Sequence, residues 1–417
     1  MFEQRLDLPA EPVWLARRLA QRPYPSLFWA KNGSLAYLTC DPVEHRRALD
    51  PEPNLRLGAR TPAHAVPRWV GLLPYECRRD LERAARVDSR TAPHLSEPHW
   101  LRYAAVAEIG AAGVRVLGDD SAAVQALAAH LQSPTREPGA VEIAPRGAFE
   151  APELHRVRIR HALEQIRAGN LYQVNLARRF AFSVRGSAFD VLARLLERGR
   201  PPYAAAFSWG ALDVVAVSPE LFVRVTTSGS IFTSPIKGTR PCGDNAERNA
   251  ELARELDTDP KERAELTMVL DVERNDLARL AQPGTVQLAD PPHVEAHGTV
   301  LHRVATLRAE LRSEPTRGEI LERMLPSGSV TGAPKVRAMD LIAELEAERR
   351  GLYTGAFGYL AHDGSLELGM AIRTLTVREG HGHYFAGGGI VADSDPEREV
   401  QETLWKAEAL LGLLAKN

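Results

Sequence analysis

The alternation of apolar and polar residues divides the chain into a weakly patterned first third and a strongly patterned remainder. Up to about residue 130, short apolar runs are interrupted by proline, and the alternating run WLRYAAVAEIGAAGVRVLG predicts strands joined by a tight turn. SAAVQALAAHLQ then predicts one amphipathic helix. Residues 132–150 are rich in proline and glycine and lack periodicity. We therefore expect a linker there, between an N-terminal region (1–131) and a larger C-terminal region (151–417).

The C-terminal region carries clear signals for the start and end of helices. Its apolar spacing predicts helices over about 153–169, 260–281, 334–350 and 396–414. The second and the last of these open with an Asp-Pro pair, in which the aspartate can cap the helix while proline takes the first helical position.

Strands are expected between these helices. YQVNLARRFAF places Tyr172, Val174 and Leu176 on one face of a strand and Gln173 and Asn175 on the other. Near the C-terminus, YTGAFGYLA, LELGMAIRTLTV and HYFAGGGIVA are separated by glycine-containing turns and predict an antiparallel meander. This order of strands and helices predicts an α+β fold with largely antiparallel sheets.

Composition narrows the class of protein. The 417 residues are 44% hydrophobic and 25% charged, which is the composition of an ordered globular protein. The formal net charge of -2 argues against a nucleic-acid partner. No apolar run approaches the length of about 18 residues that crosses a membrane, and the first residues lack the apolar core of a signal peptide. Three widely spaced cysteines match neither a disulfide framework nor a zinc site, so we expect a soluble, cytoplasmic protein.

Two pairs of glutamates stand out on the predicted helices. Glu262 and Glu265 are three residues apart on one helix, and Glu399 and Glu402 are three apart on the last one. Like charges at this spacing repel, and an oxygen-only set suits Mg²⁺. The same spacing also arises by chance among 54 acidic residues, and Lys406 lies on the face of Glu399, where it could form a surface ion pair.

Three further residues have possible catalytic chemistry. Lys237, in TSPIKGTRP, is expected on a turn, where it is either a nucleophile in a dry site or a solvated hairpin lysine. Glu220 follows a proline at the end of a strand and is a general acid only if it is buried. His302, taken alone, is typical of a core histidine.

Glycine-rich segments and one arginine suggest anion binding. PSGSVTGAP leads into a helix, so its N–H groups and the hydroxyls of Ser327, Ser329 and Thr331 could hold an anion. Glycines 387–389 either let backbone donors approach a ligand or form a bulge. Arg373, in the apolar run LELGMAIRTL, is either exposed at an edge or a clamp for a carboxylate. Together these features fit a site for a small substrate with several carboxylates.

The strings NLYQVNLARRF, PIKGTRP, KERAELTMVLDVERNDL, GSVTGAPKVRAM, AIRTL and GGGIVADSDPEREVQETLWKAE occur in order between about residue 154 and the C-terminus. In this respect the chain closely resembles the chorismate-utilising enzymes. The resemblance implies a layered αββα fold with Mg²⁺ and chorismate bound between the layers. It also implies that Glu265 and Glu402 bind Mg²⁺, and that Glu262 and Glu399 support them directly or through water.

The resemblance assigns the remaining site residues as well. Those implied to hold the substrate carboxylates are Arg373, Tyr359, Lys406, Gly387, Gly388 and Gly389. Those implied to complete the ring pocket are Ser329, Thr331, Gly332 and His302, the last with a catalytic role.

Two positions distinguish members of that family. Isochorismate-forming members typically have a lysine base where this chain has Gln173, and anthranilate-forming members typically read PIAGT where it reads PIKGT. Lys237 instead resembles the nucleophile of the members that form 4-amino-4-deoxychorismate, with Glu220 as the general acid. The ammonia is then expected from glutamine through a separate amidotransferase subunit. The alternatives are an anthranilate-forming enzyme and a non-catalytic subunit that docks a partner.

Overall fold

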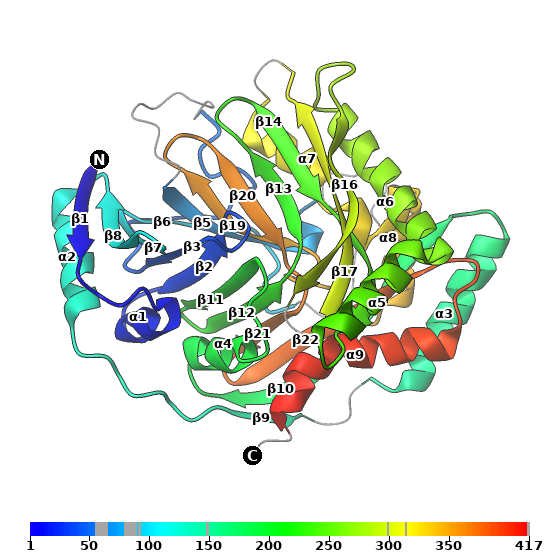
Figure 1. Cartoon of the computed structure of the whole chain (residues 1–417), viewed down its shortest axis with the longest axis horizontal. Helices are drawn as coiled ribbons and strands as arrows, with labels where there is room; N and C mark the ends of the chain where they lie inside the picture. Colours follow the sequence, from blue (N-terminus) through cyan, green and yellow to red (C-terminus); the bar gives the residue numbers. More distant parts are fainter. Residues whose placement is uncertain are drawn as a thin grey trace.

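The computed structural model of the chain describes residues 1–54, 66–78, 90, 93–146, 150–297, 300–312 and 315–414. Its strands form two large sheets, and helices lie on the outer faces of these sheets (Figure 1). The pairings within both sheets are antiparallel, as in the pair of β10 with β22 and the pair of β19 with β20. This arrangement confirms the α+β fold class predicted from the sequence.

The larger sheet has twelve strands and contains both the first strand, β1, and the last strand, β22, of the described residues. In spatial order its strands are β1 (Phe2–Leu6), β8 (Gly113–Gly118), β7 (Ala105–Gly110), β3 (Leu35–Thr39), β2 (Ser26–Ala30), β11 (Tyr203–Trp209), β12 (Leu212–Ser218), β21 (Thr374–Arg378), β22 (His381–Ile390), β10 (Gln173–Arg185) and β18 (Gly332–Ala333), and β9 (Glu142–Pro145) also pairs with β10. Since β2 pairs with β11, the N-terminal and C-terminal regions share this sheet.

The smaller sheet has ten strands and is shared in the same way. In order its strands are β15 (Ile236–Pro241), β17 (Val300–Glu310), β14 (Ser230–Ser234), β13 (Leu221–Val225), β20 (Leu366–Met370), β19 (Ala356–Ala361), β5 (Pro67–Leu73), β6 (His99–Arg102) and β4 (Glu44–Arg46), and β16 (Gln287–His297) pairs with β17. β5 of the N-terminal region pairs with β19. The linker expected at 132–150 includes the short strand β9, and its residues 147–149 lie outside the described part of the chain.

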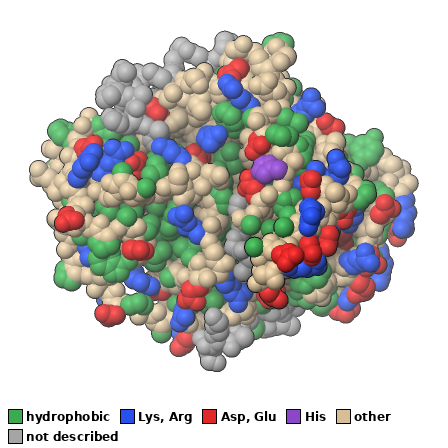
Figure 2. Space-filling model, viewed as in Figure 1, with side chains coloured by type: hydrophobic (Ala, Val, Ile, Leu, Met, Phe, Trp, Pro, Cys, Tyr) green, Lys and Arg blue, Asp and Glu red, His purple; other side chains and the backbone are tan. Residues whose placement is uncertain are grey.

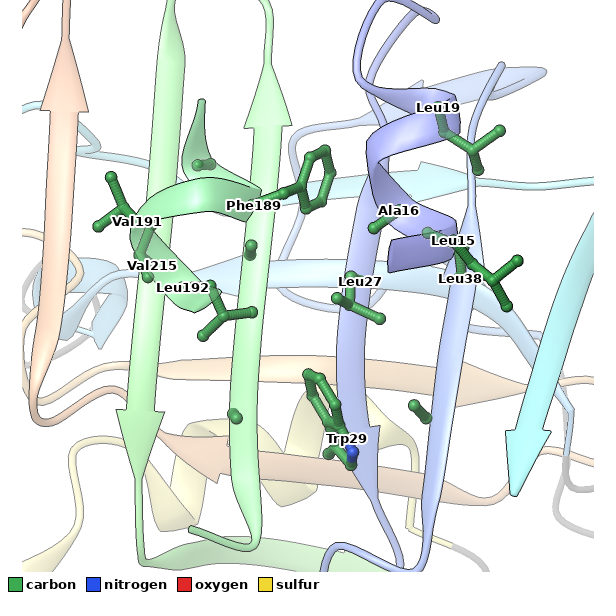
Figure 3. Packing of buried hydrophobic residues seen from close by; sticks show 14 of the residues in the cluster. Leu15, Ala16, Leu19, Leu27, Trp29, Leu38, Phe189, Val191, Leu192 and Val215 are labelled. Carbon is green, nitrogen blue, oxygen red and sulfur yellow. The ribbon is translucent and has the colours of Figure 1, made fainter. Parts of the chain in front are cut away.

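Helices and apolar clusters complete the layers. The helices are α1 (Pro12–Leu19), α2 (Ser121–Gln132), α3 (Pro152–Arg167), α4 (Ala188–Leu196), α5 (Ala246–Thr258), α6 (Pro260–Ala278), α7 (Arg317–Met324), α8 (Lys335–Leu345) and α9 (Pro396–Leu414). Figure 3 shows Leu15 of α1 and Leu192 of α4 packed over the larger sheet near Leu27. A second cluster joins α6 and α7 to the smaller sheet, and a third fills the space between the two sheets. The order is helix, sheet, sheet, helix.

The boundaries of the helices test the sequence signals. Asp259 caps α6 and accepts hydrogen bonds from the N–H groups of Lys261 and Glu262, as its position before a proline predicted. The predicted helix over 334–350 is too long, because α8 ends at Leu345. Glu346 follows with an extended backbone, and its side chain accepts a hydrogen bond from the N–H group of Ala177, in β10.

The run LELGMAIRTLTV was predicted as one strand and is two. β20 belongs to the smaller sheet and β21 to the larger one, so the chain crosses between the sheets within this run. Arg373 lies at the crossing with φ of 50°, a left-handed conformation that ends the alternation.

Acidic and basic side chains are interspersed over the face drawn in Figure 2, in keeping with the near-zero net charge. Among the helices of the described residues, none is both long enough and apolar enough to cross a membrane.

Candidate active site

Lys237 lies on β15, at the edge of the smaller sheet. The sequence predicted a turn, but the residue is in a strand whose register shifts between Lys237 and Thr239. Gly238 has φ of 77° at this bulge, which an L side chain rarely adopts. The bulge directs the ammonium group to the main-chain oxygen of Ser329, 2.8 Å away. Burial lowers the pKa of Lys237, while Glu265 and Glu220 act in the opposite direction.

Glu220 lies where the chain passes from β12 of the larger sheet to β13 of the smaller one. Its side chain is 4% exposed, so of the two alternatives the structure selects the buried acid. The hydroxyl of Ser329 donates to the carboxyl Oε1 at 2.7 Å. Burial raises the pKa of Glu220 to about 7, and the charge of Glu273 adds to that effect.

Ser329 therefore links the two groups. Its carbonyl accepts from Lys237 and its hydroxyl donates to Glu220. The sequence predicted that N–H groups of this loop bind a ligand anion, but the Ser329 N–H points to the carboxylate of Glu273 at 3.3 Å. The hydroxyl of Thr331 is likewise used inside the loop, where it donates to the main-chain oxygen of Ser327 at 2.8 Å. The loop is a scaffold for the site rather than an open anion cradle.

Gly332 ends this loop and allows it to pass close to β10. Its φ is 145°, and a Cβ there would lie 2.2 Å from the main-chain oxygen of Gln173. Gly332 thus belongs to the packing that sets the loop against β10.

His302 and Arg373 form a second pair beside the first. The guanidinium of Arg373 lies 2.7 Å from Nε2 of His302, and Nδ1 of His302 lies 3.3 Å from the main-chain oxygen of Gly238. A neutral ring that donates from Nδ1 and accepts at Nε2 satisfies both contacts. His302 is 2% exposed, so it is buried and also contacts an arginine. Burial lowers the pKa of Arg373, and its left-handed backbone replaces the strand conformation predicted for it.

The four predicted metal ligands lie on α6 and α9. Burial raises the pKa of Glu265, and the charges of Glu262 and Glu402 contribute to the shift. Burial also raises the pKa of Glu399 to about 7, with Glu402 as the next cause. Burial would raise the pKa of Glu402 too, but the lysines around it, chiefly Lys406, hold it below its usual value. The carboxylates are close enough to repel one another.

Each of these carboxylates has a partner in the structure. Glu262 pairs with Arg240 at 3.2 Å, and Glu399 accepts from the hydroxyl of Ser394 at 2.7 Å. The other two are paired with lysines of their own helices, Glu265 with Lys261 at 3.7 Å and Glu402 with Lys406 at 2.6 Å. In the described part of the chain, no three His, Cys, Asp or Glu side chains are already arranged around one metal position.

The residues nevertheless fit a divalent cation in their chemistry. The donor set consists only of carboxylate oxygens. Burial raises the pKa of Glu265 and Glu399, their mutual repulsion with the neighbouring glutamates adds to the shift, and a cation between the helices would relieve that repulsion.

The glycines of β22 bring the strand close to the acidic groups. A Cβ on Gly388 would lie 2.9 Å from Oε2 of Glu399, and one on Gly389 would lie 2.3 Å from Nε2 of Gln173 and 3.7 Å from Nζ of Lys237. The carbonyl of Gly387 accepts from Lys406 at 2.8 Å. The glycines are part of a regular ladder with β10, so they act by close approach and not as a bulge.

Tyr359 is the exception among the predicted site residues. It lies on β19 in the layer between the sheets, with its ring 5.8 Å from that of Phe28 and 5.6 Å from that of Tyr37. Its hydroxyl faces Glu367 at 3.5 Å. The structure does not bring it to the group around Lys237, because the side chain points from the smaller sheet toward the larger one.

Sequence reasoning missed Glu273 as part of this site. It lies on α6 with no exposed surface and holds both Ser327 and Ser329. A polar residue on the buried face of that helix was the available signal, but it is one of 54 acids and its neighbours in space are distant in sequence.

The fold and this arrangement of residues define a class of protein. The model of the family described as chorismate binding enzyme matches residues 13–412, so the chain belongs to that family. This confirms the resemblance drawn from the sequence motifs.

Individual relatives come from more than one branch. The chain is 43% identical over 269 residues to anthranilate synthase component 1 of Thermus thermophilus, covering 64% of this chain and 58% of the relative. It is 40% identical over 254 residues to aminodeoxychorismate synthase component 1 of Klebsiella aerogenes, covering 61% of this chain and 56% of the relative. These matches therefore span only a little over half the length of each relative.

Solved structures agree on the fold. Anthranilate synthase component I from Streptococcus pneumoniae superposes with a TM-score of 0.75 at 28% identity, over 93% of this chain and 90% of that one. The menaquinone-specific isochorismate synthase from Escherichia coli superposes with a TM-score of 0.80 over 99% of this chain and 93% of that one, but at 21% identity it supports the fold alone.

Proposed function

We propose that the chain is component I of an aminodeoxychorismate synthase, which converts chorismate and ammonia to 4-amino-4-deoxychorismate for p-aminobenzoate and folate synthesis. The observation that carries the proposal is the meeting of Lys237 and Glu220 at Ser329, with contacts of 2.8 Å and 2.7 Å. Burial lowers the pKa of the lysine and raises that of the acid, so both shifts favour the neutral forms. A neutral amine and a protonated carboxyl are a nucleophile and a general acid.

In this mechanism the amine of Lys237 adds to carbon 2 of the chorismate ring while Glu220 protonates the hydroxyl that leaves carbon 4. Ammonia then attacks carbon 4 and expels the lysine. The covalent adduct divides one difficult displacement into two easier ones. Proton donation by a positioned acid typically contributes about 10²–10⁴-fold to the rate.

The cationic side chains near this pair are suited to hold the substrate carboxylates. Arg373 is buried next to His302, and its planar fork can bind a carboxylate through two hydrogen bonds. Lys406 reaches the carbonyl of Gly387 and offers a second positive charge on the α9 side. Substrate binding would thus neutralise charges that the fold has removed from water.

Mg²⁺ is proposed as the cofactor. Glu265 and Glu402 would hold it, and Glu262 and Glu399 would support them directly or through water. When bound, it would neutralise a substrate carboxylate, which is the chemistry that an oxygen-ligated Mg²⁺ supplies. The lysines that now pair with two of these glutamates would have to move or share them.

Ammonia is proposed to come from a separate glutamine amidotransferase subunit. The relatives named component 1 support this division of labour.

The first test is incubation of the purified chain with chorismate, Mg²⁺ and ammonium, followed by identification of the product by mass spectrometry. We expect 4-amino-4-deoxychorismate. In a second reaction without ammonia, the intact protein is expected to gain the mass of chorismate less one water, located on the peptide that contains Lys237.

Lys237→Met is expected to abolish the adduct, and the exposed Lys31→Met is the matched control that retains it. Anthranilate together with pyruvate as products would refute the proposal. If the chain alone shows no turnover, the experiment is repeated with the amidotransferase added. The absence of product in that reaction would favour a subunit that docks a partner without catalysis.

Anthranilate synthase component I is the second candidate. The 43% identity to the Thermus thermophilus protein favours it. Lys237 argues against it, because that branch typically has alanine at this position and forms no lysine adduct. The product analysis distinguishes the two.

A further inference from the structure

Glu273 is a buried carboxyl group that the proposed mechanism does not use. It lies in the middle of α6, and none of its side chain is exposed. Burial raises its pKa, and Asp276 adds to this shift while Lys335 opposes it. A buried acid of this kind costs stability unless it is neutral or well bonded, so its presence calls for a physical reason.

A continuous line of hydrogen bonds joins this acid to Glu220. Ser327 donates from its hydroxyl to Oε1 of Glu273 at 2.5 Å, and the hydroxyls of Ser327 and Ser329 are 2.9 Å apart. Ser329 then contacts Oε1 of Glu220 at 2.7 Å. All four side chains are at most 4% exposed, so the line runs through the protein interior.

The number of available protons limits how the hydrogen bonds between Glu273 and Glu220 can form. It contains three hydrogen bonds between side chains, and the two serine hydroxyls supply only two protons. All three bonds form at once only if one of the carboxyl groups contributes a proton. When Glu220 contributes it, the bonds run toward Glu273, and when Glu273 contributes it, they run toward Glu220. The two arrangements differ only in the positions of protons.

We propose that Glu273 is the inner end of a proton relay, Glu273–Ser327–Ser329–Glu220, that restores the proton of Glu220 during the reaction. This inference rests on the proposed role of Glu220 as the acid. After Glu220 has given its proton to the departing hydroxyl, Glu273 passes one to Ser327, Ser327 passes its own to Ser329, and Ser329 passes its own to Glu220. Glu220 gains one proton and Glu273 loses one, while each hydroxyl is unchanged.

The proton returns in the second half of the reaction. Ammonia that attacks carbon 4 becomes an ammonium group on the product, and the site has to remove one proton from it to leave the amine. The same three transfers run in reverse, so Glu220 returns its proton to Glu273 and is ionised again, and it then accepts the proton from the ammonium group of the product. Over one turnover chorismate and ammonia give the amine and water, with both carboxyl groups as they began.

The charges around the two ends favour a shared proton. Glu220 faces Lys406 on α9 and the guanidinium of Arg373, and these cations stabilise its ionised form, as does Lys237 on β15 whenever its amine is protonated. Glu273 faces Asp276 on its own helix and Lys335 on α8, and these two form an ion pair with each other. Among the residues that the structure describes, no salt bridge to Glu220 or Glu273 therefore fixes either carboxyl group in one protonation state.

The test uses Glu273→Gln in the full chain, assayed with chorismate, Mg²⁺ and ammonium. The amide keeps an oxygen to accept from Ser327 and the Ser329 N–H, but it cannot exchange a proton. We expect kcat to fall about 10–100-fold with little change in KM. This is less than the about 10²–10⁴-fold that a positioned proton donor is typically worth, because Glu220 remains and Glu273 acts only through it. We also expect a smaller solvent deuterium isotope effect and a shifted pH profile for kcat.

Ser327→Ala is the second variant, because it removes a hydroxyl from the line and keeps both carboxyl groups, although Glu273 loses the hydrogen bond from Ser327. It should reproduce the changes in kcat and isotope effect, and Ser327→Thr, which keeps a hydroxyl, should restore them in part. Wild-type kcat and pH profile in both Glu273→Gln and Ser327→Ala would overturn the relay. A loss of kcat with an unchanged isotope effect and pH profile would also overturn it, and would assign these residues to holding the loop.

The identity of the product keeps this result separate from the proposed function. If the wild-type chain makes anthranilate, the aminodeoxychorismate proposal fails, but the isotope effect and pH profile can still be measured on that product.

Discussion

Arg350 should be among the most costly residues to remove from this protein. Its guanidinium is fully buried and pairs with Glu346 at 2.6 Å, with 0% and 4% of the two side chains exposed. It also donates to the main-chain oxygens of Val330 at 2.8 Å and Asn175 at 2.7 Å. Arg350→Met leaves the carboxylate of Glu346 buried without its cation and leaves two carbonyls unpaired. Breaking a buried pair in this way costs about 3–5 kcal/mol of unfolding free energy.

Urea denaturation followed by circular dichroism measures this loss, and Arg398→Met is the control. Arg398 is exposed on α9, so its replacement should change the free energy by no more than about 0.5 kcal/mol. In a double-mutant cycle, Glu346→Gln should recover part of the loss, with a coupling of about 1–3 kcal/mol.

Because Arg350 holds the Val330 carbonyl next to Ser329, turnover of the folded variant should fall as well. A loss below about 1 kcal/mol in Arg350→Met, or a coupling near zero, would show that the buried pair does not hold this loop and that our reasoning is wrong.

Three further predictions concern the site. Burial raises the pKa of Glu220 to about 7, so its contribution to stability is present in full below about pH 4.5 and is lost as pH rises through 7. Thermal melts should therefore show Glu220→Gln to be more stable than the wild type at pH 8 but not at pH 5. Gly389→Ala should lower kcat at least tenfold in steady-state assays while the chain stays folded, because the new Cβ would lie 2.3 Å from Gln173. In the control Gly169→Ala no atom lies within 4 Å of the added Cβ, so the φ of 76° there should lower stability but leave kcat unchanged. Calorimetry should detect Mg²⁺ binding to the wild type and much weaker binding to Glu402→Gln, since a carboxylate ligand is lost; equal affinities would contradict the proposed metal site.

Local signals in the sequence predicted much of this structure. The Asp-Pro pair at 259–260 correctly placed the start of α6, because capping depends on neighbours along the chain. The alternation in YQVNLARRF correctly predicted β10, but the strand has its polar residue Gln173 at 2% exposure while Tyr172 is 73% exposed. A polar face that is buried is typical of a functional site, and hydrophobic periodicity alone cannot show it.

The structural features that the sequence did not predict depend on contacts between residues that are far apart in the chain. Apolar residues fall at even positions up to Ile372 and at odd positions from Leu375, so the alternation changes phase at Arg373, but this pattern does not show that the chain changes sheets there. Tyr359 was assigned to the site by the resemblance, but it lies on β19, which pairs with the distant strand β5, and its ring packs against Phe28 and Tyr37. Glu273 is linked to the site only by its contacts with Ser327 and Ser329, which lie more than 50 residues later in the chain.

The order in which the chain is synthesised has a consequence for its folding in the cell. Strands made early, such as β2 and β5, wait for partners near the middle and end of the chain, β11 and β19, before their edges are covered. Helix α9 carries Glu399, Glu402 and Lys406, so the proposed site is incomplete until this helix has been synthesised. Nascent chains would expose unpaired strand edges for much of synthesis, a state prone to aggregation that chaperones usually protect. Deletion of this one helix should therefore remove Glu399 and Glu402 from the proposed site and leave an aggregation-prone product.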